Sequence, residues 1–314
     1  MGYNRHSLKL KACCDESGVD GLYRSGSSCD GAALVLGVLS VALLGGCSSI
    51  MSSATADLSR GLTSAVLDQN DPETVRQGAP AYLLMVDGLI ADHPDNPELL
   101  TTGATLYASY TSAFVDDPTR AARLAERAKR YGFAALCSVE PRTCDSWRRP
   151  FDEFEAVIAD VSPRHLEQLY TAGSAWATWI EANRSDWAAV GDKARVEAIM
   201  DRVVALDSGY RDGAPYTYLG VLNSIIPPAL GGRPEEGRRD FERAIELSGG
   251  RDLLTKVLFA REYARLVFDR ELHDRLLEEV LDANPDVPGH VLTNTMAQNE
   301  ARALLAESDI YFAE

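Results

Sequence analysis

The amino-acid sequence predicts an all-α protein, an α-solenoid of antiparallel helix pairs with about 11–12 helices in all. From residue 57 onward, apolar residues recur with the period of 3.6 that is typical of amphipathic helices. No segment of useful length alternates between apolar and polar residues, as a half-buried β-strand would. Similar helix boundaries recur along the chain, which favours a helical repeat over a closed bundle.

Proline or an Asp-Pro pair marks most helix starts, and Gly or Pro marks most helix ends. Proline suits the first helical turn, because the backbone N–H that it lacks has no partner there. The segments that combine these signals with helical periodicity are 57–69, 72–91, 97–115, 118–138, 151–160, 164–183, 186–206, 214–226, 234–248, 252–268, 270–283 and 290–311.

The repeat is visible at the boundaries between helices. Residues 89–97 read Leu-Ile-Ala-Asp-His-Pro-Asp-Asn-Pro, and residues 280–288 read Val-Leu-Asp-Ala-Asn-Pro-Asp-Val-Pro. Residues 205–210 and 245–250 occupy equivalent places, and the last three boundaries fall at intervals of about 41 and 36 residues, close to the tetratricopeptide period. Residues 57–314 are therefore expected to form one degenerate tetratricopeptide-like domain.

Small residues recur within the predicted units and allow paired helices to approach closely. The clearest unit has Tyr216, Leu219, Gly220 and Asn223 on its first helix and Gly237, Phe241 and Ala244 on its second.

Composition restricts the class of protein. The 314 residues are 46% hydrophobic and 25% charged, which is ordinary for a globular protein and excludes intrinsic disorder. Lys and Arg number 31 against 47 Asp and Glu, a net charge of −16, which argues against nucleic acid as a partner. Because residues 1–46 carry four basic and four acidic residues, this charge belongs to the remainder of the chain.

The apolar stretch from residue 32 to residue 46 is too short for a comfortable transmembrane helix and reads as the core of a secretory signal. It ends in Leu-Gly-Gly-Cys at 44–47, the pattern of a lipobox. We therefore expect residues 1–46 to be a signal peptide, Cys47 to be lipidated, and 47–56 to be a short tether. The alternatives are an unlipidated signal peptide and a buried helix with a chance cysteine. The long, neutral N-terminal region is also consistent with a start site downstream of Met1.

Only Cys137 and Cys144 remain in the exported domain if this interpretation holds. An oxidising compartment permits a pair of cysteines to form a disulfide, and their loop contains Pro141 between two helical segments. Zinc binding is less favoured, because the spacing is not Cys-x-x-Cys and no histidine is near. Two free thiols are the other alternative.

Motifs of catalysis do not occur in the sequence. The zinc-protease, nucleophile-elbow, phosphate-loop and calcium-loop patterns are absent, and the five histidines are scattered. We therefore predict that the protein is not an enzyme, with no cofactor and no metal.

Aromatic and amide side chains recur on the predicted first helices of the units, which usually line the concave face of a solenoid. These stripes are also consistent with packing between repeats. The candidates for a ligand cavity are Tyr107, Tyr110, Phe114, Trp176, Trp179, Tyr216 and Asn223, and the most favoured lining residues are Tyr110, Trp179 and Asn223.

The runs 83–137 and 213–247, together with the lipobox, resemble the T-component family of TRAP transporters (TatT). The residues that carry the resemblance best are 87–88, 93–100, 108–110, 113–115 and 218–220. This resemblance implies a lipid-anchored, tetratricopeptide-like homotrimer with a cavity in each protomer. It also implies a periplasmic solute-binding protein as partner and apolar organic acids or similar compounds as ligands.

Three functions remain open from the sequence. The favoured one is a periplasmic accessory component of a TRAP-type system, anchored in the cell envelope at the periplasmic face of the outer membrane, as Ser48 after the lipidated cysteine suggests. A tetratricopeptide scaffold that assembles envelope complexes without a small-molecule ligand is the alternative. An envelope enzyme, such as a peptidoglycan hydrolase, would need a catalytic arrangement that the sequence lacks.

Overall fold

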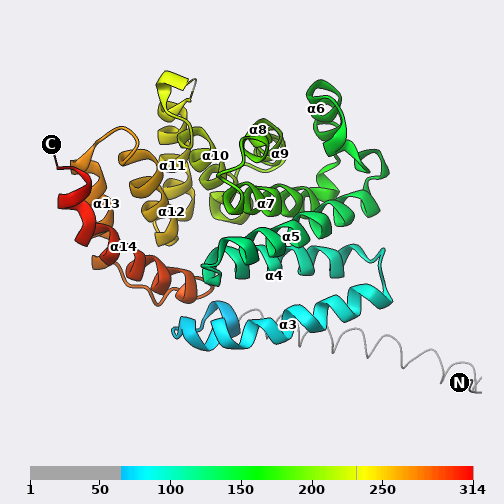
Figure 1. Ribbon diagram of the computed structural model, residues 1–314, viewed down its shortest axis with the longest axis horizontal. Helices are drawn as coiled ribbons and strands as arrows, with labels where there is room; N and C mark the ends of the chain where they lie inside the picture. The colour runs from blue at the N-terminus through cyan, green and yellow to red at the C-terminus, as the bar shows by residue number, and fades with distance from the viewer. Residues whose placement is uncertain (1–64, 231, 314) are drawn as a thin grey trace, which may run out of the picture. The chain divides into compact units, whose positions relative to one another are not determined.

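The computed structural model describes residues 65–230 and 232–313, and within them the chain is built from helices with no β-strand (Figure 1). The all-α repeat predicted from the sequence is therefore confirmed. Among the described helices, none combines the length and the apolar character needed to cross a membrane. The predicted signal peptide, the tether, Cys47 and most of the predicted helix 57–69 lie outside the described residues.

The α-helices follow one another with short connections. They are α3 (Pro72–Asp92), α4 (Pro97–Phe114), α5 (Pro118–Val139), α6 (Phe151–Ala159), α7 (Leu166–Ala182), α8 (Trp187–Gly191), α9 (Lys193–Leu206), α10 (Ala214–Ser224), α11 (Pro234–Ser248), α12 (Leu253–Leu258), α13 (Arg270–Asp282) and α14 (Val291–Tyr311).

Capping side chains explain why these helices begin where the sequence predicts. Asn96 accepts hydrogen bonds of 3.0 Å from the backbone amides of Glu98 and Leu99, and Pro97 opens α4. Asp71 and Asp117 cap α3 and α5 in the same way, each directly before a proline. Such caps satisfy amide groups that have no partner inside the helix.

Two predicted helices are interrupted. The segment 186–206 is divided into α8 and α9, because Gly191 has a low helix propensity and Asp192 favours a helix end over a helix interior. The segment 252–268 begins as α12 and continues as a π-helical turn, η6 (Phe259–Ala264).

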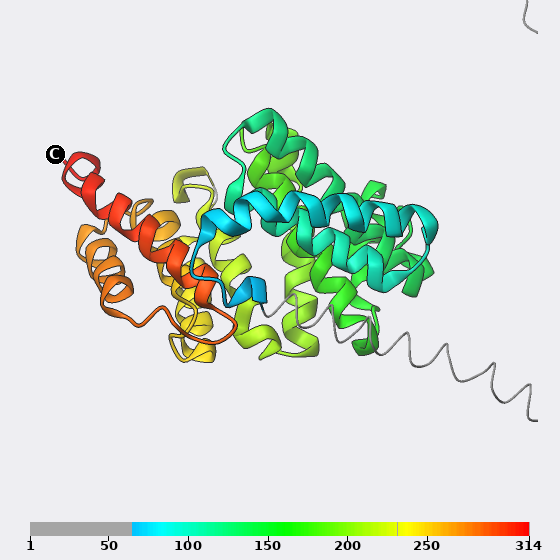
Figure 2. The same cartoon turned by 90° about the horizontal axis from the view of Figure 1, so that it is seen from below.

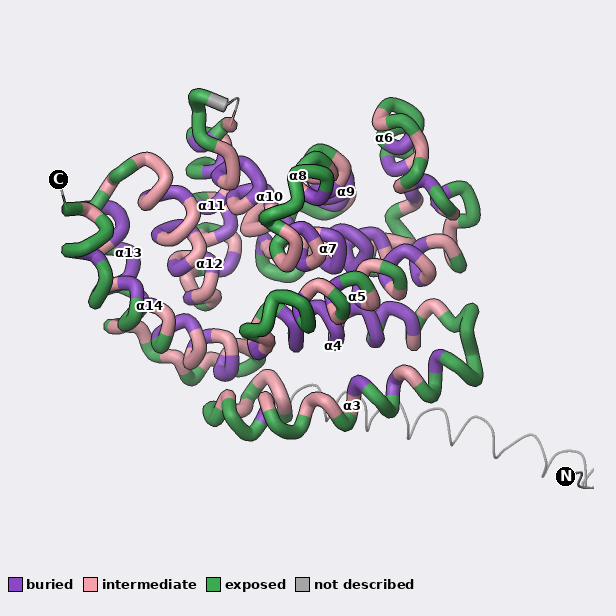
Figure 3. The backbone as a smooth tube through the Cα atoms, in the orientation of Figure 1, coloured by how far each residue is buried: buried purple, intermediate pink, exposed green. Residues whose placement is uncertain are grey.

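Neighbouring helices pack in chain order. α4 packs against α3 and α5, α5 against α7, and α7 against α9, while α10 packs between α9 and α11. Figure 3 shows α4 and α7 as largely buried and α3 as exposed along much of its length. The core is divided into clusters: one joins α5, α6, α7, α9 and α10, a second joins α11 to α14, and a third joins α3, α4 and α5.

The last helix returns to the first ones. Leu292, in the first turn of α14, belongs to the same hydrophobic cluster as Val75 and Leu83 of α3. The backbone amide of Gly289 donates a hydrogen bond of 2.6 Å to Asp68, just before α3. Figure 2 shows the beginning of α14 beside the segment that precedes α3. The first turn of α14 therefore packs against α3, the first helix in the described part of the chain.

Candidate functional site

The aromatic residues predicted on α4 lie inside the cluster formed by α3, α4 and α5. Tyr107, Tyr110 and Phe114 are all buried there. The Tyr107 hydroxyl donates a hydrogen bond of 2.8 Å to Asp87 of α3, and the Tyr110 hydroxyl accepts one of 3.2 Å from Arg120. These side chains join neighbouring helices through both apolar contacts and hydrogen bonds.

The two tryptophans predicted on α7 belong to the central cluster. Trp176 is buried with its ring centroid 5.1 Å from that of Phe133 and 5.9 Å from that of Phe154. Trp179 is partly buried, and the Nζ atom of Lys129 lies 3.4 Å from the centroid of its ring. Burial lowers the pKa of Lys129, with Glu126 acting in the opposite direction.

The last two candidates lie on α10 and have different surroundings. Tyr216 packs, partly buried, against the central cluster. Asn223 is only 5% exposed, and its side-chain Nδ2 donates a hydrogen bond of 2.9 Å to Oδ2 of Asp240 on α11. The structure thus distributes the sequence candidates over two hydrophobic clusters and one polar site.

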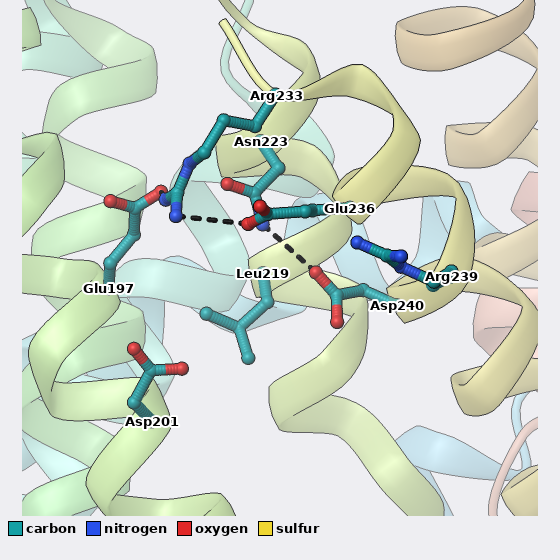
Figure 4. A pocket seen from close by; sticks show the side chains of 8 residues that line it. All are labelled: Glu197, Asp201, Leu219, Asn223, Arg233, Glu236, Arg239 and Asp240. Carbon is teal, nitrogen blue, oxygen red and sulfur yellow. Dashed lines mark hydrogen bonds and ion pairs between the residues drawn. The ribbon is translucent and has the colours of Figure 1, made fainter.

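That polar site is a pocket of about 290 Å³ between α9, α10 and α11 (Figure 4). Of the sequence candidates, Asn223 alone contributes to its lining, so Tyr110 and Trp179 do not meet Asn223 there. The pocket is also lined mainly by charged side chains, whereas the family resemblance implies apolar ligands. Its lining residues are Glu197, Asp201, Leu219, Asn223, Arg233, Glu236, Arg239 and Asp240.

Two glycines allow α10 and α11 to form this pocket. A Cβ atom on Gly220 would lie 2.8 Å from the ring of Phe241, and one on Gly237 would lie 2.9 Å from the backbone oxygen of Gly220. Both distances are shorter than side chains tolerate, so the two helices can approach this closely only with glycine at these positions. The approach brings Asn223 of α10 within hydrogen-bond distance of Asp240.

The charges in the pocket are unevenly paired. Arg233, directly before α11, forms ion pairs with Glu197 at 2.8 Å and with Glu236 at 3.0 Å. Lys193 also pairs with Glu197. Within the described residues, Asp201 takes part in no hydrogen bond or ion pair, although it faces the same space (Figure 4).

Two acidic groups of the pocket, Asp201 and Asp240, have raised pKa values. Burial raises the pKa of Asp240 to about 6; the hydrogen bond from Asn223 opposes this shift, and Asp201 and Glu236 add to it. Burial also raises the pKa of Asp201, with a further contribution from Glu197. Removal of carboxylates from water next to other carboxylates disfavours their charged forms.

The side chains of this pocket are suited to binding a ligand that carries hydrogen-bond donors. Its carboxylates and its amide oxygen are acceptors of hydrogen bonds, and Leu219 supplies one apolar surface. Among the described residues, no group of three or more His, Cys, Asp or Glu side chains is placed to hold a metal ion.

Most of the lining residues were not among the candidates that the sequence offered. Glu197 and Asp201 lie four residues apart on α9, and Glu236 and Asp240 lie four residues apart on α11, so each pair shares one helix face. This spacing was a usable signal, but it is equally typical of a solvated helix surface. Only the packing of three helices shows that the two faces meet.

Cys137 and Cys144 are joined by a disulfide, with their Cα atoms 4.7 Å apart. The bond links the last turn of α5 to the residue after a short 3₁₀ helix, η1 (Pro141–Thr143). It lies outside the pocket lining.

A family model described as TRAP transporter T-component matches residues 68–312. The match spans α3 to α14, and it confirms the family resemblance found in the sequence. The curated proteins include no sequence that matches the chain.

Proposed function

Because the chain belongs to the TRAP transporter T-component family, we propose that it acts as an accessory protein of a TRAP-type transport system outside the cytoplasm. The observation that carries this proposal is the match over residues 68–312, since it includes every helix from α3 to α14. In this role the protein binds or passes an organic ligand together with the periplasmic solute-binding protein of the system, and it performs no catalysis.

The transport role is tested in cells. Deletion of the gene should reduce uptake of the solute carried by the associated TRAP system, and expression of the full chain should restore uptake. A tagged full chain should also co-purify with the solute-binding protein of that system. Unchanged uptake, with no solute-binding protein recovered, would contradict the proposed function.

The location of the protein is part of the proposal. Lipidation of Cys47 would hold the helical domain at a membrane surface, because the bacterial lipoprotein modification supplies several acyl chains. We place the anchor in the outer membrane, facing the periplasm. This keeps the domain within reach of a soluble solute-binding protein.

Two exposed apolar patches support a homotrimer. Leu84, Met85 and Leu89 form one patch on α3, with Leu84 72% exposed. Phe268, Ile310 and Tyr311 form the other near the end of α14, with Ile310 81% exposed. A closed ring of three identical chains uses two different surfaces of each chain, so these patches are suitable partners for one another. We expect Leu84→Glu and Ile310→Glu each to reduce the molecular mass of the assembly measured by light scattering.

The aromatic side chains that the sequence proposed for a ligand cavity remain candidates to contact an apolar organic ligand. Trp179 is the best of them to test, because it is only partly buried at the edge of the central cluster. Trp179→Ala should weaken ligand binding or transfer more than it lowers the melting temperature. Trp187, which is 80% exposed on α8, provides the matched control. Equal effects of the two substitutions on ligand transfer would show that Trp179 does not contact the ligand.

One observation favours the scaffold as a second candidate. Tyr107, Tyr110, Phe114 and Trp176 are buried in clusters that join neighbouring helices, as packing residues of a repeat would be. A scaffold would bind envelope proteins with no requirement for a small molecule. Recovery of a stable envelope complex from cells that lack the solute-binding protein would favour it.

A further inference from the structure

Asn223 presents an unusual hydrogen-bonding problem. Its side-chain nitrogen is bound to Asp240, but its Oδ1 atom is buried and has no hydrogen-bond partner within the described residues. A buried acceptor without a donor costs free energy, so such an atom requires an explanation. Figure 4 shows the Asn223 amide between α9 and α11, among the side chains that line the pocket.

Two carboxylates beside it, those of Asp201 and Asp240, form no ion pair within the described residues, although Arg233 and Arg239 lie near enough to lower their pKa values in part. Arg233 and Lys193 are held by Glu197, and Arg233 is held by Glu236 as well. Asp201 also accepts no hydrogen bond from the described residues. The carboxylate of Asp240 accepts one hydrogen bond, from Asn223 to its Oδ2 atom. Arg239 compensates part of the charge on Asp240 without forming an ion pair with it.

We propose that the pocket between α9, α10 and α11 binds a small organic ammonium compound, with Asp201, Asp240 and the side-chain oxygen of Asn223 as acceptors of its N–H groups. An ammonium group supplies three donors and a positive charge, which match these three acceptors. An anionic ligand would instead face the carboxylates of Asp201 and Asp240 and be repelled.

The size and surface of the pocket narrow the ligand further. The volume of about 290 Å³ lies at the lower end of the range for small-molecule sites. Leu219 is buried in the lining between Asp201 and Asp240 and offers an apolar contact (Figure 4). A short alkyl chain carrying an ammonium group fits both features. A bare metal ion fits less well, since the described acidic groups form no metal-binding set.

Binding of a cation should depend on pH through Asp240. The pKa of this carboxyl is raised to about 6, so the group is mostly ionised at neutral pH and mostly protonated at about pH 5. The charged groups that face it are Glu197 and Asp201 from α9, Glu236 and Arg239 from α11, and Arg233 from the preceding loop. Protonation of Asp240 removes one of the two unpaired charges, so affinity falls as the pH is lowered.

The test is calorimetric titration of the full chain in detergent with n-butylamine and with 1,4-diaminobutane, both of which are cationic at about pH 8. Butyrate and n-butanol serve as ligand controls of similar size. We expect saturable binding of the amines alone, weakened about tenfold by Asp240→Asn and by Asp201→Asn. Glu242→Gln, an equal charge change on the exposed side of α11, should leave the affinity unchanged.

The pH provides a second readout. Wild-type affinity should fall about tenfold between pH 8 and pH 5, and the Asp240→Asn variant should lose most of this dependence. Thermal unfolding confirms that each variant is folded. Absence of saturable amine binding, equal binding by both Asp variants and wild type, or equal binding of butyrate would overturn the proposal. Because these titrations need no partner, their failure leaves the transport role intact, and loss of the transport role leaves them unaffected.

Discussion

The backbone amide of Gly289 donates a hydrogen bond of 2.6 Å to the Oδ1 atom of Asp68, 221 positions earlier in the chain. Gly289 has a φ of 80°, in the left-handed region that glycine enters without strain. Its turn directs the chain into α14, whose Leu292 then packs with Val75 and Leu83 of α3. The first turn of α14 is therefore held against α3, and the packing of these two helices is interdependent.

Asp240→Asn should stabilise the protein in a pH-dependent manner. The pKa of Asp240 is higher in the folded protein, about 6, than its usual value of 3.8, so the folded state is favoured at low pH and loses stability as pH rises through 6. An amide has no proton to lose. The variant should gain about 1–2 kcal/mol in free energy of unfolding above pH 7, after allowance for solvent screening, and nothing below pH 4. Urea unfolding at both pH values measures this, and a gain of equal size at low pH would contradict the explanation.

Asp87→Ala should destabilise the packing of α3. The Asp87 carboxylate accepts hydrogen bonds of 2.8 Å from the hydroxyls of Tyr107 and Tyr131, and it also pairs with Arg127. Its removal leaves partly buried hydroxyls without their acceptor, at a cost of about 2–3 kcal/mol. Denaturant unfolding gives the value, with Asp92→Ala as the control, since Asp92 is an exposed carboxylate at the end of the same helix. Equal effects of the two substitutions would show that the network contributes little.

The Cys137–Cys144 bond should stabilise the folded protein by about 2 kcal/mol, because it closes a short loop in the unfolded chain. Cys137→Ser with Cys144→Ser should lower the melting temperature accordingly, and a reducing agent should lower that of wild type to the same value. The double variant also serves as a control for other effects of the reducing agent, because the agent should leave its melting temperature unchanged. Peptide mapping without reduction should recover the two cysteines linked; recovery of both as free thiols would refute the pairing.

Cys47→Ala should release the protein from the membrane. The thiol of Cys47 follows Leu-Gly-Gly and is the expected site of the diacylglyceryl group, and its loss removes the lipid anchor. Detergent phase partitioning should place wild type in the detergent phase. Cys29→Ala, a cysteine within the predicted signal peptide, should behave as wild type. Equal partitioning of wild type and Cys47→Ala into water would contradict lipidation at this position.

Helix positions were readable from the sequence because their signals are local. Asn96 with Pro97, and Asp117 with Pro118, cap α4 and α5 at the expected residues, and such caps depend only on the next few amides. The break at Asp192 was not predicted. The helix stops at Gly191 and resumes at Lys193, and a single interrupting residue hardly changes the spacing of the apolar residues. Family membership was also visible, since the runs 83–137 and 213–247 carry it in linear order.

The candidate site depends on contacts between residues that lie far apart in the sequence. The helical class, the caps and the close approach of α10 and α11 at Gly220 and Gly237 were predictable from the sequence, and Asn223 was a candidate lining residue. It could not show that Tyr107 and Trp176 face other helices, or that Asp201 of α9 faces Asp240 of α11 across Leu219. A helix face has the same sequence pattern whether water or a second acidic helix covers it. The packing of helices from different parts of the chain sets which faces meet, because the burial of Asp240 and the resulting rise in its pKa arise from residues distant in the sequence.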